Sequence, residues 1–144
     1  MIQSYEKHFP AYEKMKEIMS SDLRKKGIHA SVYSFYLDCE QYSEKQQRQK
    51  LFKKLNELST WNPDIILVND DQALNALINS RHPLAKSIPV VFMGVSYPNI
   101  PTIRKYPNMT GFYDKPDYKR NIELIRRVVG NCIVIRGLVV SIPE

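Results

Sequence analysis

Polar and aromatic residues follow three apolar runs of this chain, at the points where strands are expected to end. Residues 69–71 follow the run 64–68, residues 94–97 follow the run 88–93, and residues 111–113 close a shorter run. Aspartates bind ammonium or hydroxyl groups, small hydroxyls and backbone N–H groups bind anions, and tyrosine rings cover apolar ligand surface. These residue types therefore favour binding of a small molecule at the ends of strands.

The motifs of common catalytic and metal sites do not occur in the sequence. There is no GxSxG, no HExxH and no Gly-rich phosphate loop, and the chain has only five glycines. His8, His29 and His82 stand apart, and we expect each on the surface or at a helix end. Cys39 and Cys132 lack CxxC spacing and could be two free thiols or one bridge. We therefore expect a protein that is not an enzyme and uses no cofactor or metal.

Helical and strand-like patterns alternate along the first half of the chain. A helix is predicted between Pro10 and Gly27, a strand over 28–37, a long helix that stops at Asn62-Pro63, and a buried strand over 64–68. The apolar positions with helical spacing are Tyr12, Met15, Met19 and Leu23 in the first helix, and Leu51, Phe52, Leu55 and Leu58 in the second.

The second half continues the same alternation. A short helix through 73–78 ends at His82-Pro83, strands follow over 88–93 and 109–113, and Pro116 opens a last helix. Apolar residues on one face of that helix are Tyr118, Ile122, Ile125 and Val129. This order predicts an α/β fold in which a doubly wound parallel sheet lies between two helix layers.

Both ends of the sequence look cut from something longer. Only Met1-Ile2-Gln3 remains where a first strand is expected, and the tail from Ile133 to Val140 is a strand-like run with nothing after it. We hypothesise that this tail takes the place of the first strand, within the molecule or in a swapped homodimer, because an open sheet edge invites pairing.

Composition indicates one soluble globular domain. The chain has 144 residues, of which 43% are hydrophobic and 25% charged. Its net charge of +6 comes from basic residues scattered over helices, which indicates solvated helix faces and no nucleic-acid partner. No apolar run reaches the roughly 20 residues of a membrane helix, and the first residues do not resemble a signal peptide. If the parent protein is exported, this chain has been trimmed.

One resemblance is to the receiver domains of response regulators. Residues 62–70 resemble the strand that carries their phosphoacceptor aspartate, residues 89–93 the following switch strand, and Lys115-Pro116 the lysine turn. Phosphoryl transfer to a carboxylate needs a divalent cation, which receivers bind with paired acids after the first strand. Here that position holds only Glu6. A receiver-like phosphoacceptor domain is therefore kept as the alternative.

A second resemblance extends over nearly the whole chain. Segments 3–5, 63–70, 88–95 and 108–113, with Asp117-Tyr118 and the helix that follows, resemble the first lobe of periplasmic-binding-protein-like domains of the ABC-transporter substrate-binding type. Such domains form the extracytoplasmic sensor region of bacterial sensor histidine kinases and hybrid two-component systems. In this family, a small ligand binds between two lobes, and cleft closure is transmitted through a membrane helix to a kinase.

The resemblance implies a domain plan and a set of binding residues. Residues 1–130 would be a flavodoxin-like first lobe with a truncated first strand, and residues 131–144 the hinge and the start of a truncated second lobe. The parent would be anchored in the inner membrane with this part on its periplasmic or extracytoplasmic side. The implied ligand-binding positions are Ser4, Tyr5, Asn69, Asp70, Asp71, Gly94, Val95, Ser96, Tyr97, Gly111, Phe112 and Tyr113.

Several of these positions have an equally good structural explanation. Asp70 or Asp71 could cap the helix that follows, and Gly94 or Gly111 could be turn glycines. Tyr5 and Ser96 are the stronger functional candidates, because the local structure of a loop seldom requires a tyrosine or a serine.

Overall fold

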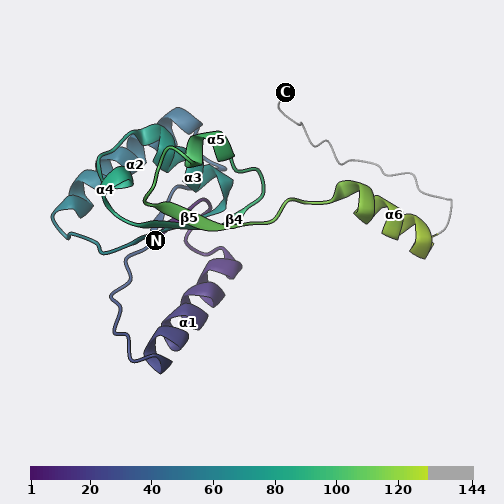
Figure 1. Cartoon of the computed structure of the whole chain (residues 1–144), viewed down its shortest axis with the longest axis horizontal. Helices are drawn as coiled ribbons and strands as arrows, with labels where there is room; N and C mark the ends of the chain where they lie inside the picture. The colour runs from purple at the N-terminus through teal and green to yellow at the C-terminus, as the bar shows by residue number, and fades with distance from the viewer. Residues whose placement is uncertain (130–144) are drawn as a thin grey trace.

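Five short parallel strands form one sheet in the computed structural model, which describes residues 1–129 (Figure 1). The strands are β1 (Ile2–Gln3), β2 (Phe35–Tyr36), β3 (Ile66–Asn69), β4 (Val90–Val95) and β5 (Met109–Tyr113). Their order across the sheet is β2-β1-β3-β4-β5, and every neighbouring pair is parallel. The predicted α/β class, with a doubly wound parallel sheet of flavodoxin-like order, is confirmed.

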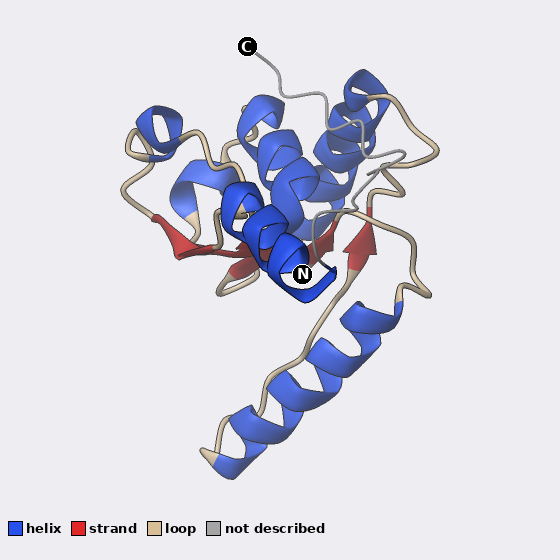
Figure 2. Ribbon diagram, turned by 90° about the vertical axis from the view of Figure 1, so that its right-hand side faces the viewer, coloured by secondary structure: helices blue, strands red, loops and turns tan. Residues whose placement is uncertain are grey.

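Helices cover the two faces of the sheet unequally. Four of them, α2 to α5, lie on one face, α1 lies alone on the other, and α6 stands away from the sheet (Figures 1 and 2). None of the helices within residues 1–129 has the length and apolar character that a membrane crossing requires. The helices are α1 (Pro10–Lys25), α2 (Glu44–Ser59), α3 (Asp70–Ser80), α4 (Leu84–Ser87), α5 (Ile100–Ile103) and α6 (Tyr118–Val129).

The hydrophobic core lies between the sheet and the helices α2 and α3. Strand residues alternate between the two faces, and those that point into this core are buried. The core includes Ile66, Val68, Val90 and Phe92 from the strands, Leu51 and Leu55 from α2, and Leu74 and Leu77 from α3. A Cβ atom at Gly111 would overlap the carbonyl oxygen and ring of Phe92, so β5 needs glycine there to pair with β4.

The first two strands differ from the sequence-based expectation. The strand predicted over 28–37 is reduced to Phe35–Tyr36, because β2 is an edge strand whose single neighbour β1 is only two residues long. Short as it is, β1 pairs with β2 on one side and β3 on the other. The central position that we hypothesised for the tail is therefore already filled by Ile2–Gln3. The tail itself, with Cys132, lies outside the described residues.

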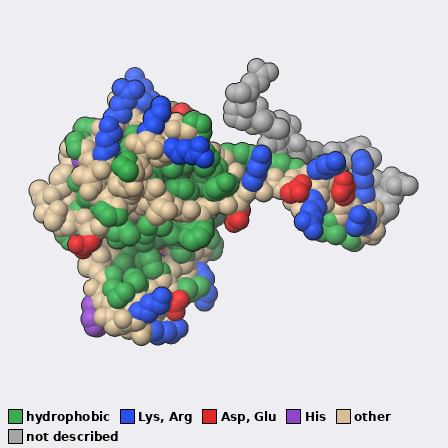
Figure 3. Space-filling view, viewed as in Figure 1, with side chains coloured by type: hydrophobic (Ala, Val, Ile, Leu, Met, Phe, Trp, Pro, Cys, Tyr) green, Lys and Arg blue, Asp and Glu red, His purple; other side chains and the backbone are tan. Residues whose placement is uncertain are grey.

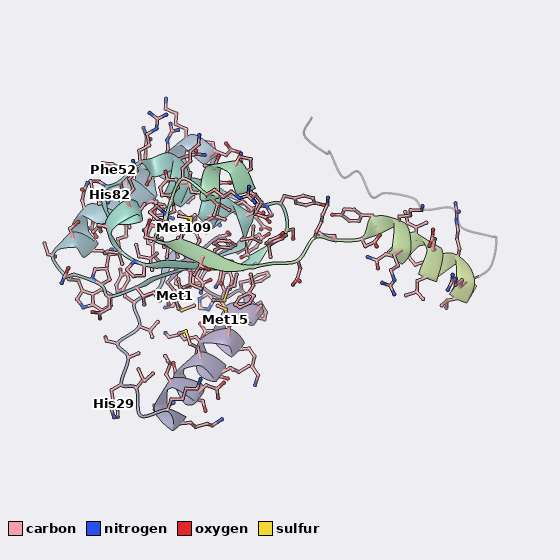
Figure 4. All side chains as sticks on the ribbon, in the orientation of Figure 1. Met1, Met15, His29, Phe52, His82 and Met109 are labelled. Carbon is pink, nitrogen blue, oxygen red and sulfur yellow. The ribbon has the colours of Figure 1, made fainter. Side chains whose placement is uncertain are left out.

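Two short helices, α4 and α5, were not predicted. His82 opens α4, where its Nδ1 atom accepts a hydrogen bond of 3.2 Å from the Leu84 N–H, and its Nε2 atom lies 3.1 Å from Asn56 Oδ1. The ring also packs edge-on against Phe52, with centroids 5.0 Å apart (Figure 4). His82 is thus at a helix end, as predicted, but it is buried, and Phe52 is partly exposed beside it.

Candidate functional site

The carboxyl ends of β1, β3 and β4 meet at one edge of the sheet. The register places Gln3 opposite Asn69, and Asn69 opposite Met93, so the residues that follow these strands lie at a common level. The chain leaves β1 towards α1 on one face and leaves β3 towards α3 on the other (Figure 1). This is the topological switch point of a doubly wound sheet, the place where such folds bind their ligands.

Ser4 joins three elements beneath this edge. Its hydroxyl donates a hydrogen bond of 2.9 Å to the Asn69 carbonyl oxygen and accepts one of 3.0 Å from the Ala73 N–H in α3. The side chain is completely buried. Ser4 therefore fixes β1 to β3 and satisfies one of the free N–H groups in the first turns of α3.

Tyr12 is the hydrogen-bonding centre of the site. Its hydroxyl oxygen accepts hydrogen bonds of 3.1 Å from the N–H groups of Ser4 and Tyr5 and donates one of 2.5 Å to Asp70 Oδ2. Burial raises the pKa of this hydroxyl well above its ordinary value, and the hydrogen bond to Asp70 raises it further. The sequence predicted Tyr12 only as an apolar position of the first helix. The residue type could have indicated this hydrogen-bonding role, because a buried tyrosine needs a partner for its hydroxyl.

Asp70 combines an unfavourable backbone conformation with an unfavourable charge. Its φ angle is +71°, in the left-handed region that residues other than glycine seldom adopt. Burial raises the pKa of its carboxyl, and the neighbouring charge of Asp71 raises it too, against the lowering effect of the Tyr12 hydrogen bond. Oδ2 is bound by Tyr12, whereas Oδ1 has no hydrogen-bond partner within residues 1–129. One carboxylate oxygen at the switch point is therefore available to a ligand.

Asp71 holds the loop that follows β4. Its two carboxylate oxygens accept hydrogen bonds of 2.9 Å each from the N–H groups of Ser96 and Tyr97. Neither Asp71 nor Asp70 caps α3 through its side chain, so the helix-cap explanation of both residues is wrong. Gly94 turns the chain here with a φ of +66°, and a Cβ atom on it would come within 3.0 Å of Asp70 Oδ1.

An aromatic cluster borders the two aspartates. Tyr5 stacks on Phe9 with ring centroids 4.8 Å apart, Phe9 lies 5.0 Å from Tyr12, and Tyr12 lies 6.5 Å from Tyr36. Tyr5 is partly buried, and that burial raises the pKa of its hydroxyl. Phe9 was not among the predicted site residues. The aromatic cluster and the free Asp70 oxygen therefore lie close together at the carboxyl edge of the sheet.

The structure brings only part of the predicted set to the exposed edge. Asn69 is buried and turned towards α1, where its Nδ2 atom donates to Gln3 Oε1 and lies 3.4 Å from Met15 Sδ. Gly111 packs against Phe92. Tyr113 and Phe112 are exposed at the end of β5, and Val95 is buried. The residues gathered around the exposed switch point are Tyr5, Asp70, Asp71, Gly94, Ser96 and Tyr97, together with Phe9 and Tyr12.

No group of three or more histidine, cysteine, aspartate or glutamate side chains in residues 1–129 is arranged to hold a metal ion. A cavity of about 630 Å³ lies elsewhere, between the end of α1 and residues 28–31.

Comparison with known proteins adds no relative. No family model matches the chain, and searches of curated proteins and of solved structures found no match.

Proposed function

We propose that this chain is the ligand-binding lobe of an extracytoplasmic sensor of the two-component histidine kinase type, or of a related solute-binding protein, and that it binds rather than catalyses. One observation carries the proposal. Asp70 keeps a strained backbone and a free carboxylate oxygen at the switch point, beside an aromatic surface. Backbone strain of this kind costs about 1–3 kcal/mol and concentrates at functional sites.

The chemistry of the site favours a ligand with a protonated amine or a hydroxyl group. Both oxygens of Asp71 and one oxygen of Asp70 are engaged by the protein, which leaves Asp70 Oδ1 as the acceptor. Burial and the charge of Asp71 disfavour the charged form of Asp70, and a cationic ligand would offset both effects. The face of Tyr5 is suited to lie against the same cation.

In this proposal the switch point is one wall of a cleft. The opposite wall would come from a second lobe that begins within residues 131–144, outside the described residues. Closure of the two lobes on the ligand would then be the signal, and the parent protein would be membrane-anchored with this lobe on the periplasmic or extracytoplasmic side of the inner membrane. The proposal rests on the sequence resemblance for its architecture and on the geometry of Asp70 for its chemistry.

Binding can be tested with a panel of amino acids, primary amines, sugars and carboxylates, screened by thermal shift and measured by calorimetry. We expect the amine-containing compounds to stabilise the protein, and Asp70→Asn to weaken their binding at least about ten-fold, a difference of about 1.4 kcal/mol. Asparagine accepts the Tyr12 hydrogen bond and tolerates the backbone conformation, so the fold is retained. Asp22→Asn on the exposed side of α1 is the matched control and should leave binding unchanged.

The receiver alternative predicts a different result with the same variant. Beryllofluoride with Mg²⁺ mimics an aspartyl phosphate, so a receiver would bind it saturably and lose that binding in Asp70→Asn. Such a result would overturn the sensor proposal. Lys115 is exposed in the linker before α6 and makes no hydrogen bond or ion pair with Asp70 in the described part of the chain.

A further inference from the structure

Helix α6 carries an apolar stripe that no other described segment covers. Its residues recur at helical spacing on one side, and all of them are exposed, up to 77% for Val128. The opposite side is strongly basic, with Lys119, Arg120, Arg126 and Arg127 around a single Glu123. The stripe consists of Tyr118, Ile122, Leu124, Ile125 and Val128.

The face of the sheet that carries α1 has a matching apolar surface. By alternation along the strands, Leu67, Val91, Met93 and Phe112 point to this face, opposite the core residues beside them. Leu67, Val91 and Met93 are partly exposed, and Phe112 is 82% exposed. Hydrophobic side chains gather in this region, between the sheet and α1 (Figure 3).

The two surfaces agree in size. Twelve helical residues extend about 18 Å, and a strand of five or six residues extends about 17–20 Å. A parallel sheet of this kind is normally covered by helices on both faces. One helix of the length of α6 therefore fits the area beside α1.

The connection between β5 and α6 favours docking on another molecule. The first turn of α6 is fixed at the carboxyl edge of the sheet by a hydrogen bond of 2.6 Å between the hydroxyls of Tyr97 and Tyr118. Asp117 starts the helix by accepting a hydrogen bond of 2.9 Å from the Arg120 N–H. Residues 114–116 between these two contacts belong to no helix or strand, and Lys115 is restricted to extended conformations by Pro116. The helix accordingly points away from its own sheet (Figure 1).

We infer that two copies of this chain form a two-fold dimer in which the apolar stripe of each α6 lies on the α1-bearing sheet face of the other copy. Exchange of an identical element between two copies is a low-cost route to dimers. The contact occurs twice in the dimer, which doubles the apolar area that it buries. It involves neither Asp70 nor the aromatic cluster, and its one link to the proposed ligand site is the hydrogen bond between the hydroxyls of Tyr118 and Tyr97.

The test is the mass of the complete chain in solution, measured by light scattering over roughly a hundred-fold range of concentration. We expect a dimer for the wild type. Ile125→Asp on the helix and Phe112→Asp on the sheet should each raise the dimer dissociation constant at least about ten-fold. Lys119→Ala, on the polar side of α6, is the control and should leave it unchanged.

Mixing the two variants distinguishes helix-on-sheet exchange from other association. The Phe112→Asp copy retains an intact helix and the Ile125→Asp copy an intact sheet face, so their mixture should form a heterodimer with one complete contact. A dimer that persists in Phe112→Asp alone would show helix-to-helix pairing and overturn the inference. A monomeric wild type would also overturn it, and sedimentation with anionic vesicles would then show whether α6 binds membrane surfaces instead.

Discussion

The two faces of the sheet differ in how completely residues 1–129 cover them. On the α2–α5 face, Ile66, Val90 and Phe92 are buried in the core. On the α1 face, the neighbouring Val91 and Met93 remain partly exposed, although they are as apolar. Strands that are apolar on both sides are typical of sheets buried on both faces. Within residues 1–129, α1 alone leaves part of this apolar face exposed, and the proposed docking of α6 would cover it.

The largest expected difference in stability is between alanine substitutions at two neighbouring isoleucines. Ile66 is 6% exposed on the core face, and Ile65 is 48% exposed. Ile66→Ala should lower the free energy of unfolding by about 2–5 kcal/mol, because it leaves a cavity among packed side chains. Ile65→Ala should change it by less than about 1 kcal/mol. Urea unfolding followed by circular dichroism measures both, and equal losses would show that the two faces do not differ as described.

A smaller effect is expected where α1 attaches to the less covered face. Tyr12→Phe removes the acceptor for two backbone N–H groups and the donor to Asp70. The free energy of unfolding should fall by about 1–3 kcal/mol, the cost of leaving buried polar groups without partners. Tyr36→Phe is the control, since its ring is near Tyr12 but its hydroxyl makes no hydrogen bond within residues 1–129. If the Tyr12→Phe variant is as stable as Tyr36→Phe, the hydrogen bonds of the Tyr12 hydroxyl do not stabilise the fold as described.

The free energy of unfolding should also depend on pH, because His82 is buried on the α2–α5 side of the sheet. Burial lowers the pKa of this imidazole, so the folded state favours its neutral form. The unfolded state binds the proton more readily, and stability is lost as the pH falls below the unfolded value of about 6.5. Protonated Nδ1 also cannot accept the hydrogen bond from Leu84, which adds a loss of up to about 1 kcal/mol. Unfolding free energies at pH 7.5 and 5.5 should differ more in the wild type than in His82→Asn.

The smallest effect concerns Phe112 in a monomer. In an Ile125→Asp background, which removes the proposed dimer contact, Phe112→Ser should change the free energy of unfolding by less than about 0.5 kcal/mol. The reason is that 82% of the side chain is already exposed. A loss above 2 kcal/mol by urea unfolding would instead place Phe112 within the packed interior of a single chain.

Long periodic segments made most of the fold predictable from the sequence. The predicted strand 109–113 coincides with β5, and the helix between Pro10 and Gly27 with α1, which ends at Lys25 just before Gly27 at a φ of +73°. The helices α4 and α5 have four residues each, too few to show a period. The extent of β2 was overestimated because β-propensity in residues 28–34 says nothing of the length of the neighbouring strand.

The candidate site was predictable in position but not in detail. Apolar runs that end in polar residues located the edge formed by residues 4–5, 69–71 and 94–97. The roles of individual side chains depended on contacts between distant residues, such as Tyr12 with Asp70 and Asp71 with Ser96. Spacing along a chain does not reveal such pairs. Asp71 and Ser4, both predicted to contact ligand, make hydrogen bonds that hold the loop and strands in place, which the sequence did not indicate.

The conformation of Asp70 implies a local conflict between folding and sequence. Asparagine is more tolerant of a positive φ, could accept the same hydrogen bond from Tyr12, and would remove a charge that burial and Asp71 disfavour. Asp70→Asn is therefore expected to melt at a higher temperature than the wild type, and a lower melting temperature would contradict this. The residue at position 70 is then not the one that would stabilise the fold best, which makes this position a site of local energetic frustration.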